Sequence, residues 1–185
     1  MSEQIEVFTE DGASLGRFTP DAQGATMVEV RLLGFPLELM MAAREHYDGL
    51  MREFRLLAMD GHISDTDAPA QLVQMVQVLG EQYGASRSRR DELLEAAIAR
   101  GERVIDLVDV VPDTTGEAVV GLRTVMEEAD RFCEQALLMT LPREPLIKQF
   151  ADWYFDQYET QVAGGAPIAW DGPVGLEHAE SVAGR

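Results

Sequence analysis

The feature that most constrains the fold is a long apolar stripe with the period of an α-helix. It follows Pro36, a residue suited to the first turn of a helix because it has no N–H to donate. Apolar side chains then recur three or four residues apart at Leu37, Met40, Ala43, Tyr47, Leu50, Met51, Phe54, Leu57 and Ala58. A stripe of about six turns predicts one long amphipathic helix and a mainly α domain built around it.

Four further segments carry helical signals, at about residues 67–84, 88–101, 114–137 and 145–162. Ser88 and Asp91 fit a Ser-x-x-Asp capping pattern, and Thr114 and Glu117 form a second capping box. Each segment also spaces its apolar residues as one helical face requires. With the first helix, these segments predict a five-helix bundle.

Two short segments have strand character and are expected to form a small two-stranded β element. Residues 28–33 alternate apolar and polar side chains, and residues 104–111 are β-branched and end at Pro112. Near the start of the chain, apolar residues flank a Glu-Asp-Gly turn signal at residues 10–12, which allows a weak hairpin. The fold class expected is therefore mainly α with a little β.

The 185 residues fit one domain, because no internal repeat and no second core is visible. We expect residues 1–25 to be a flexible segment or weak hairpin and residues 26–163 to be the helical bundle. A Gly-Gly-Ala-Pro run after Val162 indicates the end of regular structure, so residues 164–185 are expected to form a flexible tail. Trp170 is the one residue of this tail suited to folding back onto the bundle.

Charge and cysteine content bound the partners and the compartment. With 33 acidic against 15 basic residues, the net charge is −18 at pH 7, and so negative a chain is repelled by nucleic acid and by anionic membranes. A single cysteine, no secretory leader pattern and no apolar stretch of about 20 residues predict a soluble cytoplasmic protein.

The chain lacks the motifs of familiar enzyme and metal sites. Its three histidines have no partner at a zinc-ligand spacing, and no phosphate loop, dinucleotide fingerprint or nucleophile elbow occurs. Cys133 lies on a predicted buried stripe, where a packing role is expected. The sequence therefore predicts a protein that is not an enzyme and holds no cofactor or metal.

Several runs of residues together resemble a known family. They are residues 30–39, 43–54, 100–112, 128–133 and 150–154. They look like a family of small actinobacterial proteins often carried near anti-sigma-factor kinases, antagonist domains and serine phosphatases. The resemblance implies a role in partner-switching stress signalling, with a kinase, antagonist or phosphatase as the partner.

Two functions from different classes follow. The first is a regulatory module that binds another signalling protein through a helix face, with contacts at Arg44, His46, Tyr47, Arg87, Arg89 and Arg90. The arginines at residues 87–90 suit an acidic partner, since their charge opposes the dipole of the helix that they begin. The alternative is a small-molecule sensor with a pocket lined by Tyr47, Phe54, Phe132, Trp153 and Tyr154. An enzyme using His46 is the weakest interpretation, and the oligomeric state, including a homodimer, stays open.

Overall fold

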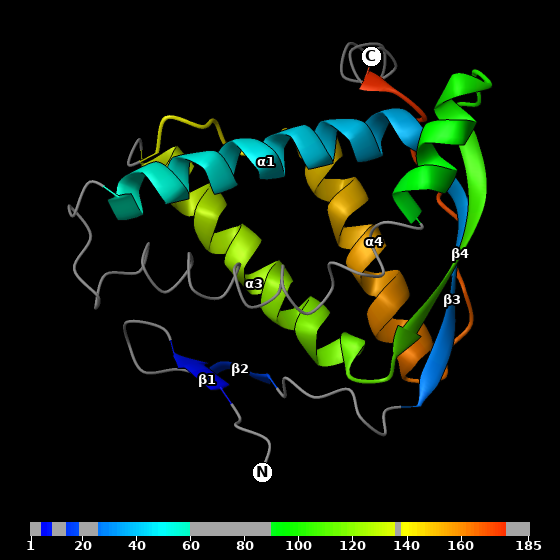
Figure 1. The fold of residues 1–185 in the computed structure, drawn as a ribbon, viewed down its shortest axis with the longest axis horizontal. Helices are drawn as coiled ribbons and strands as arrows, with labels where there is room; N and C mark the ends of the chain where they lie inside the picture. Colours follow the sequence, from blue (N-terminus) through cyan, green and yellow to red (C-terminus); the bar gives the residue numbers. More distant parts are fainter. Residues whose placement is uncertain (1–4, 9–13, 19–25, 60–89, 136–137, 177–185) are drawn as a thin grey trace.

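The computed structural model describes residues 5–8, 14–18, 26–59, 90–135 and 138–176 (Figure 1). Its elements run in the order β1 (Ile5–Phe8), β2 (Ser14–Phe18), β3 (Met27–Pro36), α1 (Leu37–Met59), a helix over residues 90–99, β4 (Val104–Pro112), α3 (Thr115–Glu134) and α4 (Pro145–Val162).

The described part of the chain is mainly helical, as predicted, and contains four helices rather than five. The predicted helix near residues 67–84 lies outside the described residues. The apolar stripe of α1 is confirmed, because Leu50 and Phe54 are buried while Met41 is exposed. None of the described helices is long and apolar enough to cross a membrane.

The predicted two-stranded β element is confirmed by β3 and β4, which pair antiparallel with Leu32 opposite Leu107. Strand alternation turns Val30, Leu32 and Leu107 into the core. The register shifts between Leu32 and Phe35, at Gly34, whose φ of 68° favours glycine. At this bend Asp106 accepts a hydrogen bond from the Gly34 N–H at 2.7 Å.

β1 and β2 form the antiparallel hairpin that the sequence allows in residues 1–25, with Ile5 opposite Phe18. In the rest of the fold, α3 and α4 lie side by side and α1 crosses above both, while β3 and β4 stand at one end of the helices (Figure 1). One core cluster joins the sheet to the start of α1, the residue 90–99 helix and α4. A second cluster joins the later turns of α1 to α3.

The segment after α4 packs against β3 and the first turn of α1. Trp170 is only 9% exposed, and its ring packs edge-to-face on Phe150 and Trp153 at centroid distances of 5.9 and 5.5 Å. The backbone N–H of Trp170 donates to the Leu33 carbonyl at 2.9 Å. The sequence placed this segment in a flexible tail because its residues have no period, but the burial of Trp170 extends the domain beyond residue 163. Residues 177–185 lie outside the described residues.

Candidate functional site

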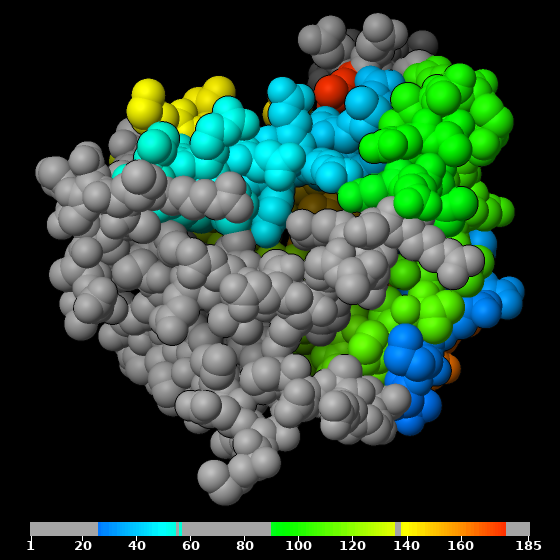
Figure 2. Space-filling model, viewed as in Figure 1, coloured from blue at the N-terminus to red at the C-terminus, as the bar shows by residue number. Residues whose placement is uncertain are grey.

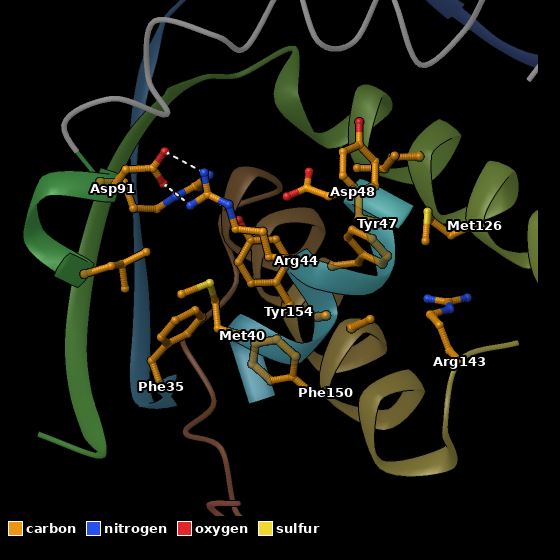
Figure 3. A pocket seen from close by; sticks show the side chains of 16 residues that line it. Phe35, Met40, Arg44, Tyr47, Asp48, Asp91, Met126, Arg143, Phe150 and Tyr154 are labelled. Atoms are coloured by element: carbon orange, nitrogen blue, oxygen red, sulfur yellow. Dashed lines mark hydrogen bonds and ion pairs between the residues drawn. The ribbon is translucent and has the colours of Figure 1, made fainter. Parts of the chain in front are cut away.

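A cavity of about 200 Å³ lies between α1, the residue 90–99 helix, α3 and α4 (Figure 3). Most of its wall is apolar, with side chains from each of these helices and from the end of β3. The apolar part includes Phe35, Met40, Ala43, Leu94, Leu122, Met126, Phe150, Ala151 and Phe155. The polar part includes Arg44, Tyr47, Asp48, Arg90, Asp91, Arg143 and Tyr154.

Helical spacing explains why these side chains meet. On α1, Met40, Arg44 and Asp48 are each four residues apart, so they line one face of the helix. Phe150 and Tyr154 repeat the same spacing on α4. A cavity between four helices arises where facing side chains do not reach far enough to fill the space.

Three aromatic rings form one end of the cavity. Phe35 and Phe150 meet edge-to-face with ring centroids 5.6 Å apart. The centroid of the Tyr154 ring lies 6.2 Å from that of Phe35 and 6.3 Å from that of Phe150. Rings in this arrangement favour a further ring placed edge-to-face or offset against them. This end of the cavity therefore suits a flat apolar group.

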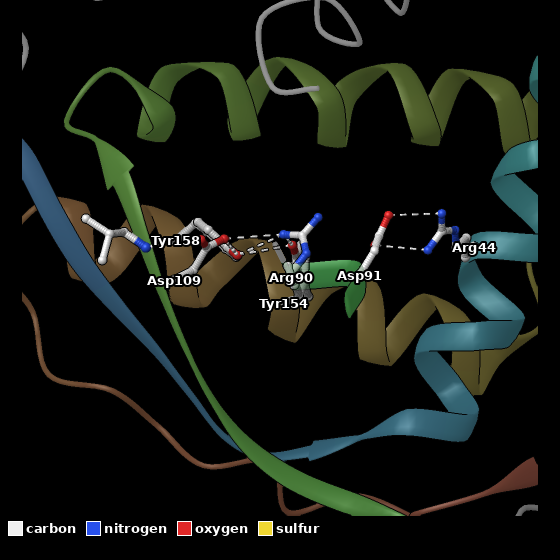
Figure 4. A network of polar contacts seen from close by, with 7 residues as sticks. Arg44, Arg90, Asp91, Asp109, Tyr154 and Tyr158 are labelled. Atoms are coloured by element: carbon white, nitrogen blue, oxygen red, sulfur yellow. Dashed lines mark hydrogen bonds and ion pairs between the residues drawn. The ribbon is translucent and has the colours of Figure 1, made fainter. Parts of the chain in front are cut away.

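Arg90 lies beside these rings, and a network of polar contacts fixes its guanidinium (Figure 4). Its Nη1 donates to the Tyr154 hydroxyl at 2.9 Å, to Asp109 Oδ2 at 3.3 Å and to the Tyr158 hydroxyl at 3.4 Å. The Tyr158 hydroxyl donates to the same Asp109 oxygen at 2.9 Å. Burial raises the pKa of Tyr158 well above its usual range, so this hydroxyl keeps its proton.

Arg44 and Asp91 also line the cavity and form a bidentate ion pair, at 3.0 and 3.3 Å. The pair connects α1 to the residue 90–99 helix, two elements that lie side by side in Figure 2. Half of the Arg44 side chain is exposed, so solvent screens the pair and its contribution to stability is small.

Arg143 reaches the cavity from the segment that precedes α4 and pairs with Asp130 of α3. Its Nη2 lies 2.7 Å and its Nε 2.9 Å from Asp130 Oδ2, and its backbone N–H donates to Oδ1 at 3.1 Å. The Arg143 side chain is 3% exposed and that of Asp130 is 12% exposed. Two buried charges are thus compensated by each other and by a backbone group.

His46 lies near this ion pair. Within the described part of the chain its Nε2 is buried and makes no hydrogen bond. Burial lowers the pKa of His46, the Asp130 carboxylate acts in the opposite direction, and the Arg143 guanidinium lowers the pKa further. The lowered pKa makes His46 a weaker base than a free imidazole, and the residue as a whole is half-buried.

The structure brings together only some of the predicted contact residues. Arg44, Tyr47 and Arg90 line the cavity, whereas Arg87 and Arg89 lie outside the described residues. Arg90 was predicted to offer its charge to a partner protein, but its guanidinium turns inward to Asp109.

Of the residues predicted to line a ligand pocket, Tyr47 and Tyr154 do so. Phe54 and Phe132 belong instead to the core cluster between α1 and α3. Trp153 packs against Trp170 and donates to the Ile168 carbonyl at 3.0 Å. These three residues carry the right apolar character, but helix orientation turns them to other contacts.

Metal binding and thiol chemistry gain no support. In the described ranges no group of three or more His, Cys, Asp or Glu side chains is arranged to hold a metal ion. Cys133 is buried in the cluster between α1 and α3, as predicted, and burial, with the nearby Asp130 and Glu53 carboxylates, raises the pKa of its thiol to about 11. The thiol is protonated at neutral pH and is therefore a weak nucleophile.

No protein-family model matches this chain, and no curated protein or solved structure matches it. The resemblance to small actinobacterial proteins stays a prediction.

Proposed function

We propose that this protein is a small-molecule-binding domain whose ligand occupies the cavity between the four described helices. The observation that supports this function is the cavity itself: about 200 Å³ of space, walled mainly by apolar side chains. Concave sites lined mostly by apolar side chains with a few polar groups are where proteins usually bind small molecules.

The size of the cavity sets the size of the ligand. An engineered apolar cavity of about 150 Å³ in another protein is large enough to bind benzene. The larger cavity here has room for one ring with a short substituent, such as ethylbenzene. A sensor or carrier of small aromatic molecules fits this geometry.

Filling the cavity is expected to abolish binding. Ala43 lines the cavity from α1, and Ala43→Leu places a larger apolar side chain in the space that ethylbenzene would occupy. We expect the affinity for ethylbenzene to fall about tenfold or more, with stability unchanged or raised. Binding is measured from NMR shifts of the Met40 and Met126 ε-methyl groups, which line the cavity. Exposed Met139 serves as the reference methyl.

The matched control is Ala96→Leu, which makes the same change on an exposed position of the residue 90–99 helix. It is expected to bind ethylbenzene as the unaltered protein does. The proposal would be contradicted if ethylbenzene shifts neither the Met40 nor the Met126 methyl resonance of the wild-type protein. It would also be contradicted if the Ala43→Leu variant binds ethylbenzene as tightly as the wild type does.

A second proposal is the one that the sequence resemblance implies, a cytoplasmic, non-enzymatic regulatory module that binds another signalling protein. One observation favours it. Met139 is 93% and Leu141 78% exposed, on a loop that projects past α1 in Figure 2. Glu53 fixes this loop by accepting hydrogen bonds from the Met139 and Thr140 N–H groups. Fixed, exposed apolar side chains are suitable anchors for a partner protein.

Leu141→Asp tests this second function. Placing a charge on the loop is expected to eliminate capture of a kinase, antagonist or phosphatase partner by the tagged protein from its host's lysate, read by mass spectrometry. The control is Ile168→Asp, because Ile168 is similarly exposed but lies on another segment. Equal partner recovery with both variants would exclude the loop as the contact.

A further inference from the structure

Among the described residues, only one nitrogen of the Arg90 guanidinium donates hydrogen bonds. A guanidinium carries five N–H donors, shared among Nη1, Nη2 and Nε. In the part of the chain that the structure describes, every hydrogen bond donated by Arg90 comes from Nη1. Among the described residues, the Nη2 and Nε groups of this cavity-lining side chain have no acceptor.

The surroundings of these donors are apolar. Arg90 is joined through Tyr154 to the aromatic end of the cavity, where Phe35, Phe150 and Tyr154 meet. An apolar molecule placed there would remove water from the Arg90 donors without replacing its hydrogen bonds, which costs free energy. A ligand with an oxygen acceptor next to its ring would avoid this cost.

The charges around the cavity favour a neutral acceptor over a carboxylate. Arg90 already pairs with Asp109, at 3.3 Å. Arg143, the other buried arginine of the wall, already pairs with Asp130. On the cavity wall itself Asp91 already pairs with Arg44, and Asp48 adds one further carboxylate. A second anion beside Arg90 would gain little from a cation that is already neutralised and would be repelled by these carboxylates.

From these contacts we infer the class of ligand: a small neutral aromatic molecule with one carbonyl or hydroxyl oxygen, its ring against Phe35, Phe150 and Tyr154 and its oxygen accepting from Arg90. This inference rests on the proposed small-molecule function and narrows it. Arg90 is the residue that sets specificity, because three partners fix its guanidinium beside the aromatic rings.

Two probes of nearly the same shape test the role of Arg90. Acetophenone has a carbonyl group where ethylbenzene has a methylene group, so only acetophenone offers a hydrogen-bond acceptor. We expect Arg90→Met to weaken acetophenone binding about tenfold, and to change ethylbenzene binding by no more than about twofold. Affinities are read from the Met40 and Met126 methyl shifts with the full-length protein.

The outcomes separate this inference from the function on which it rests. If ethylbenzene binds the wild type but Arg90→Met leaves acetophenone binding unchanged, or weakens both probes equally, Arg90 does not receive the oxygen and only the inference fails. If benzoate binds the wild type more tightly than acetophenone does, the inference that the ligand is neutral is wrong. If neither ethylbenzene nor acetophenone shifts the cavity methionines, the proposed function fails as well.

A second variant keeps the test valid if Arg90→Met does not fold. Arg90→Lys retains a cation next to Asp109 but loses the fork of donors that a guanidinium presents. It is expected to show the same selective loss of acetophenone binding with ethylbenzene binding preserved. Thermal unfolding of each variant confirms that it is folded before its affinities are compared.

Discussion

Replacing Arg143 with methionine is expected to lower the free energy of unfolding by about 3–5 kcal/mol. The substitution leaves the Asp130 carboxylate, which is 12% exposed, without the cation that compensates it. It also removes the hydrogen bond from Nε, although the backbone N–H of residue 143 still donates to Asp130. Urea unfolding followed by circular dichroism measures the loss.

A double variant separates the charge from the packing. Asp130→Leu combined with Arg143→Met replaces the buried ion pair with apolar side chains, and such exchanges are often close to neutral in stability. We expect the pair of substitutions to recover most of the stability that Arg143→Met loses. Arg31→Met is the control, because Arg31 pairs with Glu29 in solvent, and its effect is expected to stay within about 1 kcal/mol. An Arg143→Met variant as stable as this control would show that the buried pair contributes nothing.

Trp170→Ala is expected to cost about 3–5 kcal/mol, the usual range for removing a buried Trp or Phe side chain. Its indole packs on Phe150 and Trp153 and donates to the Pro173 carbonyl at 3.0 Å. The loss would appear as a lower urea midpoint with two-state unfolding retained, since the segment packs directly on the core.

Ile168→Ala is the matched control, because Ile168 lies two residues from Trp170 but is 62% exposed. Its effect is expected to stay within about 0.5 kcal/mol. A Trp170→Ala variant as stable as Ile168→Ala would mean that the segment after α4 does not belong to the folded domain.

The elements that the sequence predicted are those with a strong local period. The stripe that begins at Leu37 has the spacing of a helix, and residues 28–33 have the alternation of a strand, so both α1 and β3 could be identified before any contact was known. The partner strand β4 was recognised by its β-branched residues despite Asp106 and Asp109. These two carboxylates interrupted the pattern because both make contacts, Asp106 with the bend at Gly34 and Asp109 with Arg90.

The site was harder to predict because its residues meet only in three dimensions. Arg143 gave no signal in the sequence, since nothing in its neighbourhood indicates a buried partner on α3. A cavity has no sequence pattern either, because it is the space that facing side chains leave unfilled. Tyr47 and Tyr154 were predicted to line a pocket from their size and helical position, while Phe54, with the same properties, faces the other core cluster.

The segment after α4 has a consequence for how the chain folds during synthesis. Leu176 donates its N–H to Glu38 across 138 positions of sequence, and Gln161 hydrogen-bonds the backbone of Arg31 across 130 positions. Contacts between such distant residues close long loops and form slowly compared with those of simple helical bundles. On the ribosome, β3 and the first turn of α1 therefore gain their last packing partners only after residues 161–176 have emerged.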